Sequence, residues 1–165
     1  MYKRQPDNCI AGYWSDTEVC RCGVLKQKNI RKRARDYIEK YDIRVAEENG
    51  NVSQLSGGNA QKIIIAREFE SHPNLIIACQ PTRGVDVGSI EFIHKQLLKF
   101  RNEGNAVLLI SSELTEIMSL SDRVAVMYKG KIIGEVDPKT ISTAEIGLLM
   151  AGAVQSPAAK EEVPQ

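Results

Sequence analysis

Two adjacent glycines behind a serine, at the start of an apolar stretch, are the residues of this sequence best suited to bind an anion. The segment Leu55-Ser56-Gly57-Gly58-Asn59 is followed by Gln61 and the apolar run 63–66. A helix that begins with glycines presents backbone N–H groups without partners inside the helix, and the helix dipole adds positive potential there. Ser56 can cap that helix and also offer its hydroxyl to the anion. A loop that merely begins a helix would show the same Ser-Gly-Gly, so the segment alone leaves both interpretations open.

A second segment has the pattern of a strand that ends in a functional loop. Pro73 and Pro81 flank the apolar run 75–79, and Gln80 and the loop 82–86 follow it. A short apolar run between turn residues is typical of a fully buried parallel strand. Open parallel sheets bind ligands at the carboxyl ends of their strands. We therefore expect a site where this run ends.

The order and spacing of the two segments resemble those of the ABC transporter ATPases. Residues 55–59 match the signature motif of that family, and residues 75–81 stand where its Walker B strand belongs. Residues 82–86 match its D-loop, with Asp86 as the D-loop aspartate. Three motifs in the order of the family make this resemblance specific.

A finer resemblance is to bacterial importers of simple sugars and nucleosides. In that family two nucleotide-binding domains are fused, and the second carries altered catalytic residues. Residues 55–62, 80–88 and 146–152 resemble that second domain, and residues 89–94 favour its nucleoside-type members. The resemblance covers residues 7 to about 152, which is nearly the whole chain.

Three positions depart from the pattern of the family. Where the Walker B strand ends in Asp-Glu, this chain has Cys79-Gln80. A thiol is a poor ligand for Mg²⁺, which prefers hard oxygen donors, and a glutamine cannot accept the proton of an attacking water. Ser112, which follows the apolar run 106–110, stands at the position of the switch histidine. The resemblance therefore implies a catalytically degenerate domain with no intact catalytic residue and no metal ligand.

The fold expected from this resemblance is a partial one. No segment fits Gly-x-x-x-x-Gly-Lys-Ser/Thr, the loop that holds the β- and γ-phosphates of ATP. We expect an α/β fold, a partial P-loop NTPase domain of three layers with a mostly parallel sheet, lacking its Walker A half. Residues 6–152 would be the C-terminal portion of that domain, residues 153–165 a disordered tail, and residues 1–5 an adapter scar rather than a native basic N-terminus. Such a sheet would leave apolar faces of residues 75–78 and 106–110 exposed.

The resemblance also implies a role in a pair of domains, since ABC domains bind each ATP between the phosphate loop of one domain and the signature of the other. ATP, with Mg²⁺, would be held mainly by a partner nucleotide-binding domain, fused N-terminally in the parent chain. Transmembrane permease subunits would be further partners, at the cytoplasmic face of the bacterial inner membrane. Ser56, Gly57 and Gly58 would donate to the γ-phosphate, and Asp86 would couple the two sites. The implied ATP-binding residues are Leu55, Ser56, Gly57, Gly58, Asn59, Gln61 and Asp86.

Two other classes of protein remain as alternatives. A structural dimerisation module would no longer bind nucleotide, but an altered signature would be expected there, and Ser56-Gly57-Gly58 is intact. A non-transport ABC ATPase, such as a translation or repair factor, would need the Asp-Glu pair that Cys79 and Gln80 replace. The family is one of ATPases, and we expect this chain alone to hydrolyse no ATP.

The composition disfavours several further classes. The 165 residues include 22 Lys and Arg against 21 Asp and Glu, so no overall basic field favours a nucleic acid. Hydrophobic residues (42%) and charged residues (26%) are in the proportions of an ordinary globular protein. No apolar run approaches the ~20 residues that span a bilayer, so a membrane link would require a partner. The spacing of the four cysteines fits neither a zinc site nor a disulfide framework: Cys9, Cys20, Cys22 and Cys79.

Helical periodicity predicts three long helices around the motifs. The first covers residues 27–41, with a solvated basic face at 26–35, and the second is the signature helix, from Gly57 to about Glu70. Asp86 or a near neighbour caps the third, which runs to about Arg101, before the left-handed terminator Gly104. The residues expected on the buried sides are Ile30, Ala34, Ile38 and Tyr41, then Ile64, Ile65 and Phe69, then Ile90, Ile93, Leu97 and Phe100.

Shorter elements are expected between and after these helices. A turn at residues 49–51 leads into the signature, and a short helix covers residues 113–120. Two strands, 123–128 and 131–136, are joined by Lys129-Gly130, and a final helix covers residues 143–150.

Overall fold

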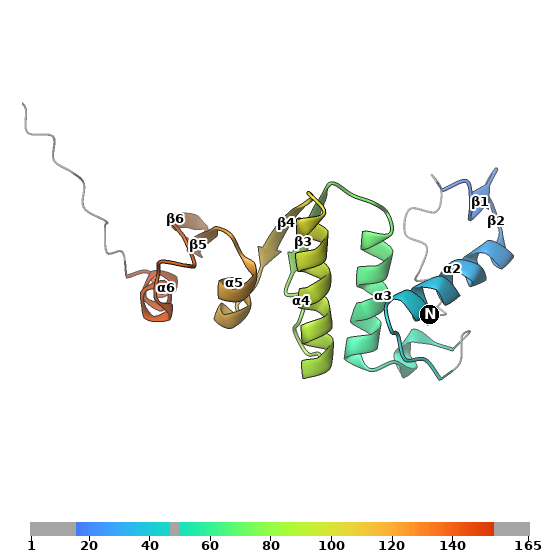
Figure 1. Cartoon of the computed structure of the whole chain (residues 1–165), viewed down its shortest axis with the longest axis horizontal. Coiled ribbons are helices and arrows are strands. Elements are labelled where there is room, and N and C mark those ends of the chain that lie inside the picture. Colours follow the sequence, from blue (N-terminus) through green and yellow to red (C-terminus); the bar gives the residue numbers. More distant parts are fainter. Residues whose placement is uncertain (1–15, 47–49, 154–165) are drawn as a thin grey trace, which may run out of the picture. The chain divides into compact units, whose positions relative to one another are not determined.

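The computed structural model describes residues 16–46 and 50–153 and divides into two compact units, Met1–Ile110 and Ser111–Gln165. The expected scar at residues 1–5 and all but the first residue of the expected tail lie outside the described residues. The first unit contains β1 (Cys20–Arg21), β2 (Val24–Leu25), α2 (Gln27–Lys40), η1 (Val52–Gln54), α3 (Gly57–Phe69), β3 (Leu75–Cys79), α4 (Val87–Asn102) and β4 (Ala106–Ile110) (Figure 1). The second contains α5 (Leu114–Leu120), β5 (Val124–Tyr128), β6 (Lys131–Val136) and α6 (Thr143–Met150).

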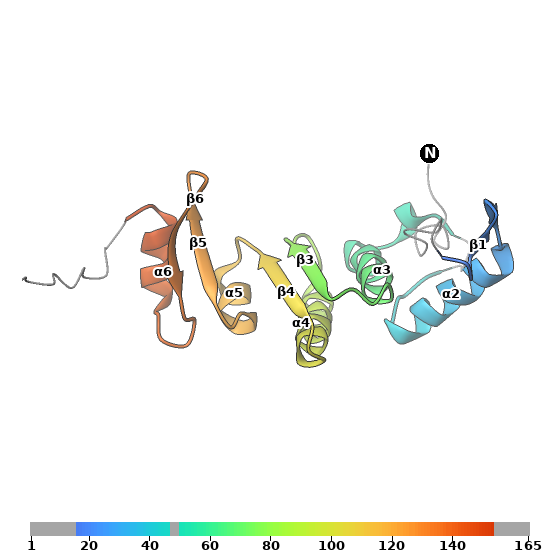
Figure 2. The ribbon, with the colours of Figure 1, turned by 90° about the horizontal axis from the view of Figure 1, so that it is seen from above.

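The core of the first unit lies where α3 packs against α2 and against α4 (Figures 1 and 2). Ile30 of α2 and Ile93 of α4 are fully buried. At the carboxyl ends of α3 and α4, the rings of Phe69 and Phe100 stack with centroids 5.1 Å apart. The three helices predicted from periodicity are thus confirmed within a residue or two at each end.

The burial predicted for the signature helix is wrong at one position. Ile64 is 42% exposed, whereas Ile63 and Ile65 are buried. Because α3 has helices on two sides, it buries a broad face that includes Lys62 and Ala66, and Ile64 points away from that face.

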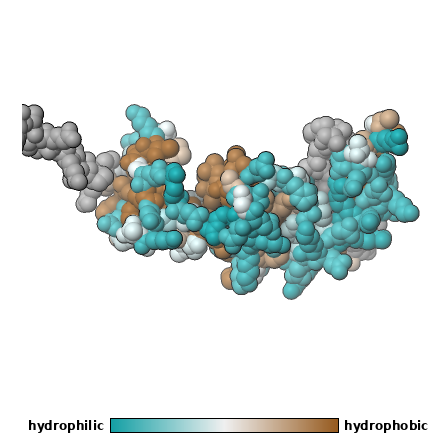
Figure 3. Space-filling view, turned by 45° about the horizontal axis from the view of Figure 1, so that its top comes forward, coloured by the Kyte–Doolittle hydropathy of each residue, from teal (hydrophilic) through white to brown (hydrophobic). Residues whose placement is uncertain are grey.

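Strands β3 and β4 form a parallel pair in which Ile77 lies opposite Leu108. Their parallel pairing confirms the strand prediction, but full burial is wrong, since Leu75 is 53% exposed, Ile77 61% and Leu108 50%. Among the described residues this sheet has two strands, and α4 contacts β4. Alternate side chains point to opposite faces, so one face is covered and the other is open. The expected exposed apolar face is therefore confirmed, and Figure 3 shows apolar surface over β3 and β4.

The second unit is a β-hairpin with a helix packed on it. β5 and β6 pair antiparallel through Lys129 and Gly130, whose φ angles of 47° and 78° suit a tight hairpin turn. Helix α6 packs against β5 and buries Ile146. Ser142 and Glu145 form a reciprocal capping box at its start. The predicted strands and helices of this region are confirmed within a residue at each end.

A short hairpin, two turns and the lengths of the helices remain to be compared with the sequence predictions. The hairpin of β1 and β2, which turns through Cys22 and Gly23 at positive φ, has no counterpart among the predicted elements. The predicted turn at 49–51 falls partly outside the described residues, while Gly104 has φ 91°, as expected of a helix terminator. Within the described ranges, no helix is both long and apolar enough to cross a bilayer.

Candidate functional site

The start of α3 has the geometry of a capped helix with a polar, solvent-facing entrance. Ser56 is the N-cap, and its Oγ accepts hydrogen bonds from Asn59 Nδ2 at 2.9 Å and from the Asn59 backbone N–H at 3.4 Å. Both of these partners are donors, so the hydroxyl proton of Ser56 remains to be donated to an acceptor. Ser56 and Gly57 are exposed. The predicted cap is confirmed, and the exposed N–H groups of the first turn suit a phosphate.

Two side chains of α3 fix this entrance to the segment that follows α2. Asn59 Oδ1 accepts a hydrogen bond from the backbone N–H of Arg44 at 2.8 Å. Lys62 is only 7% exposed, and its Nζ donates to the Asp42 carbonyl at 2.7 Å. The same ammonium lies 3.2 Å from Asp42 Oδ2 and 4.7 Å from the Phe92 ring centroid. A buried cation requires such partners, so Lys62 braces the signature helix.

The carboxyl end of β3 carries the two altered positions. Cys79 ends the strand with its side chain exposed, and the backbone N–H of Gln80 donates to the Ile110 carbonyl at 2.8 Å. Gln80 has φ 50°, a left-handed conformation that costs a non-glycine residue about 1 kcal/mol or more. The structure thus places both residues at the strand end where a ligand site was expected. A thiol and an amide do not fit a magnesium ion, and among the described residues no cluster of His, Cys, Asp and Glu is placed to hold a metal.

The D-loop ends in a second helix cap. Asp86 is the N-cap of α4: its Oδ1 accepts the backbone N–H of Ser89 at 2.9 Å and its Oδ2 accepts the Ser89 hydroxyl at 2.8 Å. Hydrogen bonds from the Ser89 backbone and then from its hydroxyl favour the charged form, which lowers the pKa of Asp86 below its usual range. The predicted cap is confirmed. Ser89, which donates both of these hydrogen bonds, was not singled out in the sequence, and the spacing Asp86-x-x-Ser89 is the signal that could have found it.

The two caps lie directly against each other. A Cβ atom built on Gly58 would lie 2.6 Å from Asp86 Oδ2 and 2.8 Å from the Ser89 Cβ. A Cβ on Gly57 would lie 3.0 Å from the carbonyl oxygen of Gly84. Gly58 is therefore buried under the D-loop, whereas Gly57 is exposed. The structure brings the signature and the D-loop together in one site.

The other predicted residues take different places. Leu55 ends η1 and is half-buried, and Gln61 is half-buried on α3. Ser112 belongs to the second unit, where it is exposed just before α5. Their roles in binding or catalysis stay predictions.

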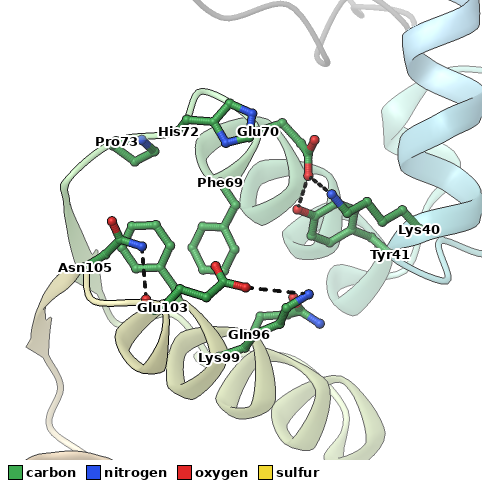
Figure 4. Close-up of a pocket in the computed structure, with 11 residues that line it drawn as sticks. Lys40, Tyr41, Phe69, Glu70, His72, Pro73, Gln96, Lys99, Glu103 and Asn105 are labelled. Atoms are coloured by element: carbon green, nitrogen blue, oxygen red, sulfur yellow. Dashed lines mark hydrogen bonds and ion pairs between the residues drawn. The ribbon is translucent and has the colours of Figure 1, made fainter.

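A hollow of about 300 Å³ lies at the opposite ends of α3 and α4 from the caps. Figure 4 shows Lys40 and Tyr41 converging on one oxygen of Glu70, at 2.6 and 2.7 Å. Burial alone would raise the pKa of Glu70, but these two hydrogen bonds outweigh it and lower the pKa. Lys99 and Glu103 on its rim lie 4.0 Å apart. Its charges are thus paired with one another, which indicates a structural junction of the three helices.

Comparison with known proteins agrees with these motifs. The chain is 53% identical over 138 residues to the guanosine import ATP-binding protein NupO of Bacillus subtilis, covering 84% of the chain and 27% of NupO. It is 52% identical over 130 residues to the nucleoside import ATP-binding protein NupA of Lactococcus lactis, covering 79% and 26%. It is 37% identical over 142 residues to the ribose import ATP-binding protein RbsA of Roseobacter denitrificans, covering 86% and 27%. The chain spans about a quarter of the length of these curated relatives. No protein-family model matches it.

Solved structures show the same fold. A dimeric ATP-binding cassette in a post-hydrolysis state, bound to ADP and phosphate, matches with a TM-score of 0.60 at 25% identity, over 73% of this chain and 52% of that one. An inward-facing ABC transporter of the metal-chelate type matches with a TM-score of 0.72 at 16% identity, over 92% and 60%. With the motifs in place and up to 53% of the aligned residues identical in these relatives, the chain belongs to the ABC ATP-binding proteins and folds as part of an ABC ATPase cassette.

Proposed function

We propose that this chain supplies the signature loop that closes the ATP site of a partner nucleotide-binding domain in an ABC importer. The observation that carries the proposal is the start of α3, where the Ser56 hydroxyl and the exposed Gly57 form a capped, glycine-opened helix entrance. A negatively charged phosphate gains from the N–H groups and from the dipole of such a helix. Each charge-assisted hydrogen bond there is worth about 1.5–3 kcal/mol.

The residues at the carboxyl end of β3 support the same proposal. Hydrolysis needs a group that accepts the proton of the attacking water and a hard ligand shell for Mg²⁺, and Cys79 and Gln80 supply neither. ATP and its Mg²⁺ would therefore be held mainly by the partner domain, fused N-terminally in the full protein. Permease subunits would complete the importer, with this chain peripheral on the cytoplasmic face of the membrane.

The substrate we propose is a nucleoside, with a simple sugar as the alternative. The two relatives that share more than half of the aligned residues import guanosine and nucleosides by name. The ribose import protein of Roseobacter denitrificans shares 37%. The permease and the binding protein would set this choice, so a transport assay of the assembled importer with labelled guanosine and ribose decides it.

The central test compares two substitutions in the assembled importer. Ser56→Arg places a bulky cation where the phosphate would lie and should lower ATP turnover by about tenfold or more, the equivalent of ~1.4 kcal/mol of barrier or more. Gln80→Ala is the matched control and should change turnover little, because the Gln80 amide cannot accept the proton of an attacking water. Equal losses in the two variants would refute the proposed division. Full turnover in Ser56→Arg would favour a structural dimerisation module instead.

A further inference from the structure

We propose that Ser89 is a positioning residue that locks the D-loop aspartate onto the second signature glycine, so that the signature loop and the D-loop move as one body. This inference rests on the proposed function, since it concerns how the same ATP site is coupled to its surroundings. It assigns a role to a residue outside the three motifs.

The first step is the way Ser89 holds Asp86. Ser89 is only 6% exposed, and it occupies both carboxylate oxygens, one with its backbone N–H at 2.9 Å and one with its hydroxyl at 2.8 Å. An N-cap aspartate needs only the first of these bonds to cap its helix. The second fixes the rotation of the carboxylate, so Asp86 is held as a rigid extension of α4.

The second step is the contact of this pair with the signature. Gly58 has no room for a Cβ, because that atom would overlap the Ser89 hydroxyl and would lie 2.8 Å from the Ser89 Cβ. Carbon atoms prefer separations of about 3.5–4.0 Å. The hydroxyl can turn away, but the Ser89 Cβ moves only with the backbone of α4. Any shift of the first turn of α3 toward α4 must therefore displace the D-loop.

The third step is that the two helices are joined along their whole length. Beyond the contact of Gly58 with Ser89, Lys62 lies over the Phe92 ring at 4.7 Å, and Phe69 stacks on Phe100 at 5.1 Å. The two residues of each pair lie 30 or 31 positions apart in the sequence, so α3 and α4 run parallel and in register. Figure 1 shows the two helices side by side. A phosphate that draws on Ser56 and Gly57 would thus carry the D-loop with it.

The test is a size exchange in the assembled importer. Gly58→Ala should lower kcat by about tenfold to a hundredfold, since ~1 Å of misplacement has effects of this size, and should leave the KM for ATP within about twofold, because the partner domain holds the nucleotide. Gly58→Ala with Ser89→Gly should recover kcat to within about threefold of Ser89→Gly alone, because the Ser89 Cβ is removed and the Asp86 carboxylate, 2.6 Å from the added methyl group, loses the hydroxyl that fixes it and can turn away. Gly58→Ala with Ser89→Ala should stay low, because the obstructing Cβ remains. Gly88→Ala is the matched control, since its Cβ would meet Asp86 Oδ1 at an ordinary 3.4 Å.

Each alternative outcome overturns the inference. Full turnover in Gly58→Ala shows that the contact is not needed. If Ser89→Gly does not rescue a folded Gly58→Ala protein, the alanine acts by blocking phosphate. If Ser89→Ala rescues turnover as well as Ser89→Gly does, the Ser89 Cβ is irrelevant.

A second measurement separates this inference from the proposed function. Hydrogen exchange of the amides of residues 84–90 in the nucleotide-free importer should quicken when Gly58→Ala is added to the parent protein, and should change little when Gly58→Ala is added to Ser89→Gly. The expected exchange pattern does not depend on the result with Ser56→Arg. Full turnover in Ser56→Arg would refute the proposed binding of phosphate at the signature loop but not this coupling. Unchanged exchange in Gly58→Ala would refute the coupling alone.

Discussion

The start of α3 and the end of β3 lie in the same unit, but they have kept different chemistry. At the start of α3, the Ser56 cap, the exposed Gly57 and the Lys62 brace are all in place. At the end of β3, a thiol and an amide stand where carboxylates would serve magnesium and water, and Gln80 is in a left-handed conformation. Under the proposed function, this difference would separate phosphate binding from hydrolysis within one domain, since helix-start N–H groups need no acidic partner whereas water activation does.

The largest expected effect tests whether any hydrolysis remains at the degenerate end. The chain alone should release no phosphate from ATP above a protein-free control with magnesium present. Cys79→Asp with Gln80→Glu should not restore it, because the sequence contains no loop of the Gly-x-x-x-x-Gly-Lys-Ser/Thr type. Magnesium-dependent release that co-purifies with the chain through a second column would contradict this prediction.

The next effect concerns the open face of the β3–β4 pair. Ile77 and Leu108 face each other across the strands and are exposed, so the chain alone should self-associate and unfold without a sharp transition. Ile77→Lys with Leu108→Glu should raise the monomer fraction in light scattering. Ile76→Lys, at a half-buried position on the other face, is the control and should unfold the pair instead. A monodisperse unsubstituted chain with a cooperative thermal transition would contradict the prediction.

A smaller effect tests the brace of the signature helix. Lys62→Ala removes the ammonium that binds Asp42 and lies over Phe92, and should destabilise the first unit by about 1.5–3 kcal/mol. Lys95→Ala removes an exposed ion pair with Glu91 and should cost less than about 1 kcal/mol. Urea unfolding in the soluble Ile77→Lys, Leu108→Glu background compares the two substitutions. Equal losses in the free energy of unfolding would mean that the Lys62 contacts do not stabilise the signature helix.

One substitution at the start of α3 should lower the folding stability, and one at the end of β3 should raise it. Ser56→Ala removes a helix cap and should lower stability by about 1 kcal/mol. Gln80→Gly places a glycine where φ is 50° and should raise stability by about 1 kcal/mol. Thermal unfolding of both substitutions in the soluble Ile77→Lys, Leu108→Glu background shows whether one lowers and the other raises stability. A loss of stability in Gln80→Gly would contradict the strain argument.

The smallest expected effect is the acid dependence of the Asp86 cap. Because the folded pKa of Asp86 is lowered below its unfolded value, the cap contributes fully above about pH 4–5, and its contribution is lost as pH falls through the folded value. In the soluble Ile77→Lys, Leu108→Glu variant, the thermal midpoint should fall between pH 6 and pH 3, and adding Asp86→Asn should flatten part of that slope. An unchanged slope in Asp86→Asn would assign the acid sensitivity to other carboxylates.

Much of the site could be predicted from sequence because its parts are local. The caps at Ser56 and Asp86 and the hairpin turn at Lys129-Gly130 follow from side chains and backbone angles within a few residues. The capping box of Ser142 and Glu145 was equally visible in the spacing, though it was not predicted. The strands β1 and β2, of two residues each, are too short to show any period.

The sequence by itself determined the family resemblance and the order of the motifs, and it predicts the positions at which catalytic groups are replaced. Only the tertiary structure decided that Ile64 faces outward, that one face of β3 is open, and that Gly58 lies under Asp86 and Ser89. These contacts join residues some thirty positions apart through the packing of α3 on α4. Side-chain periodicity tells which residues share a face of a helix, but which neighbour covers that face depends on how distant elements pack together.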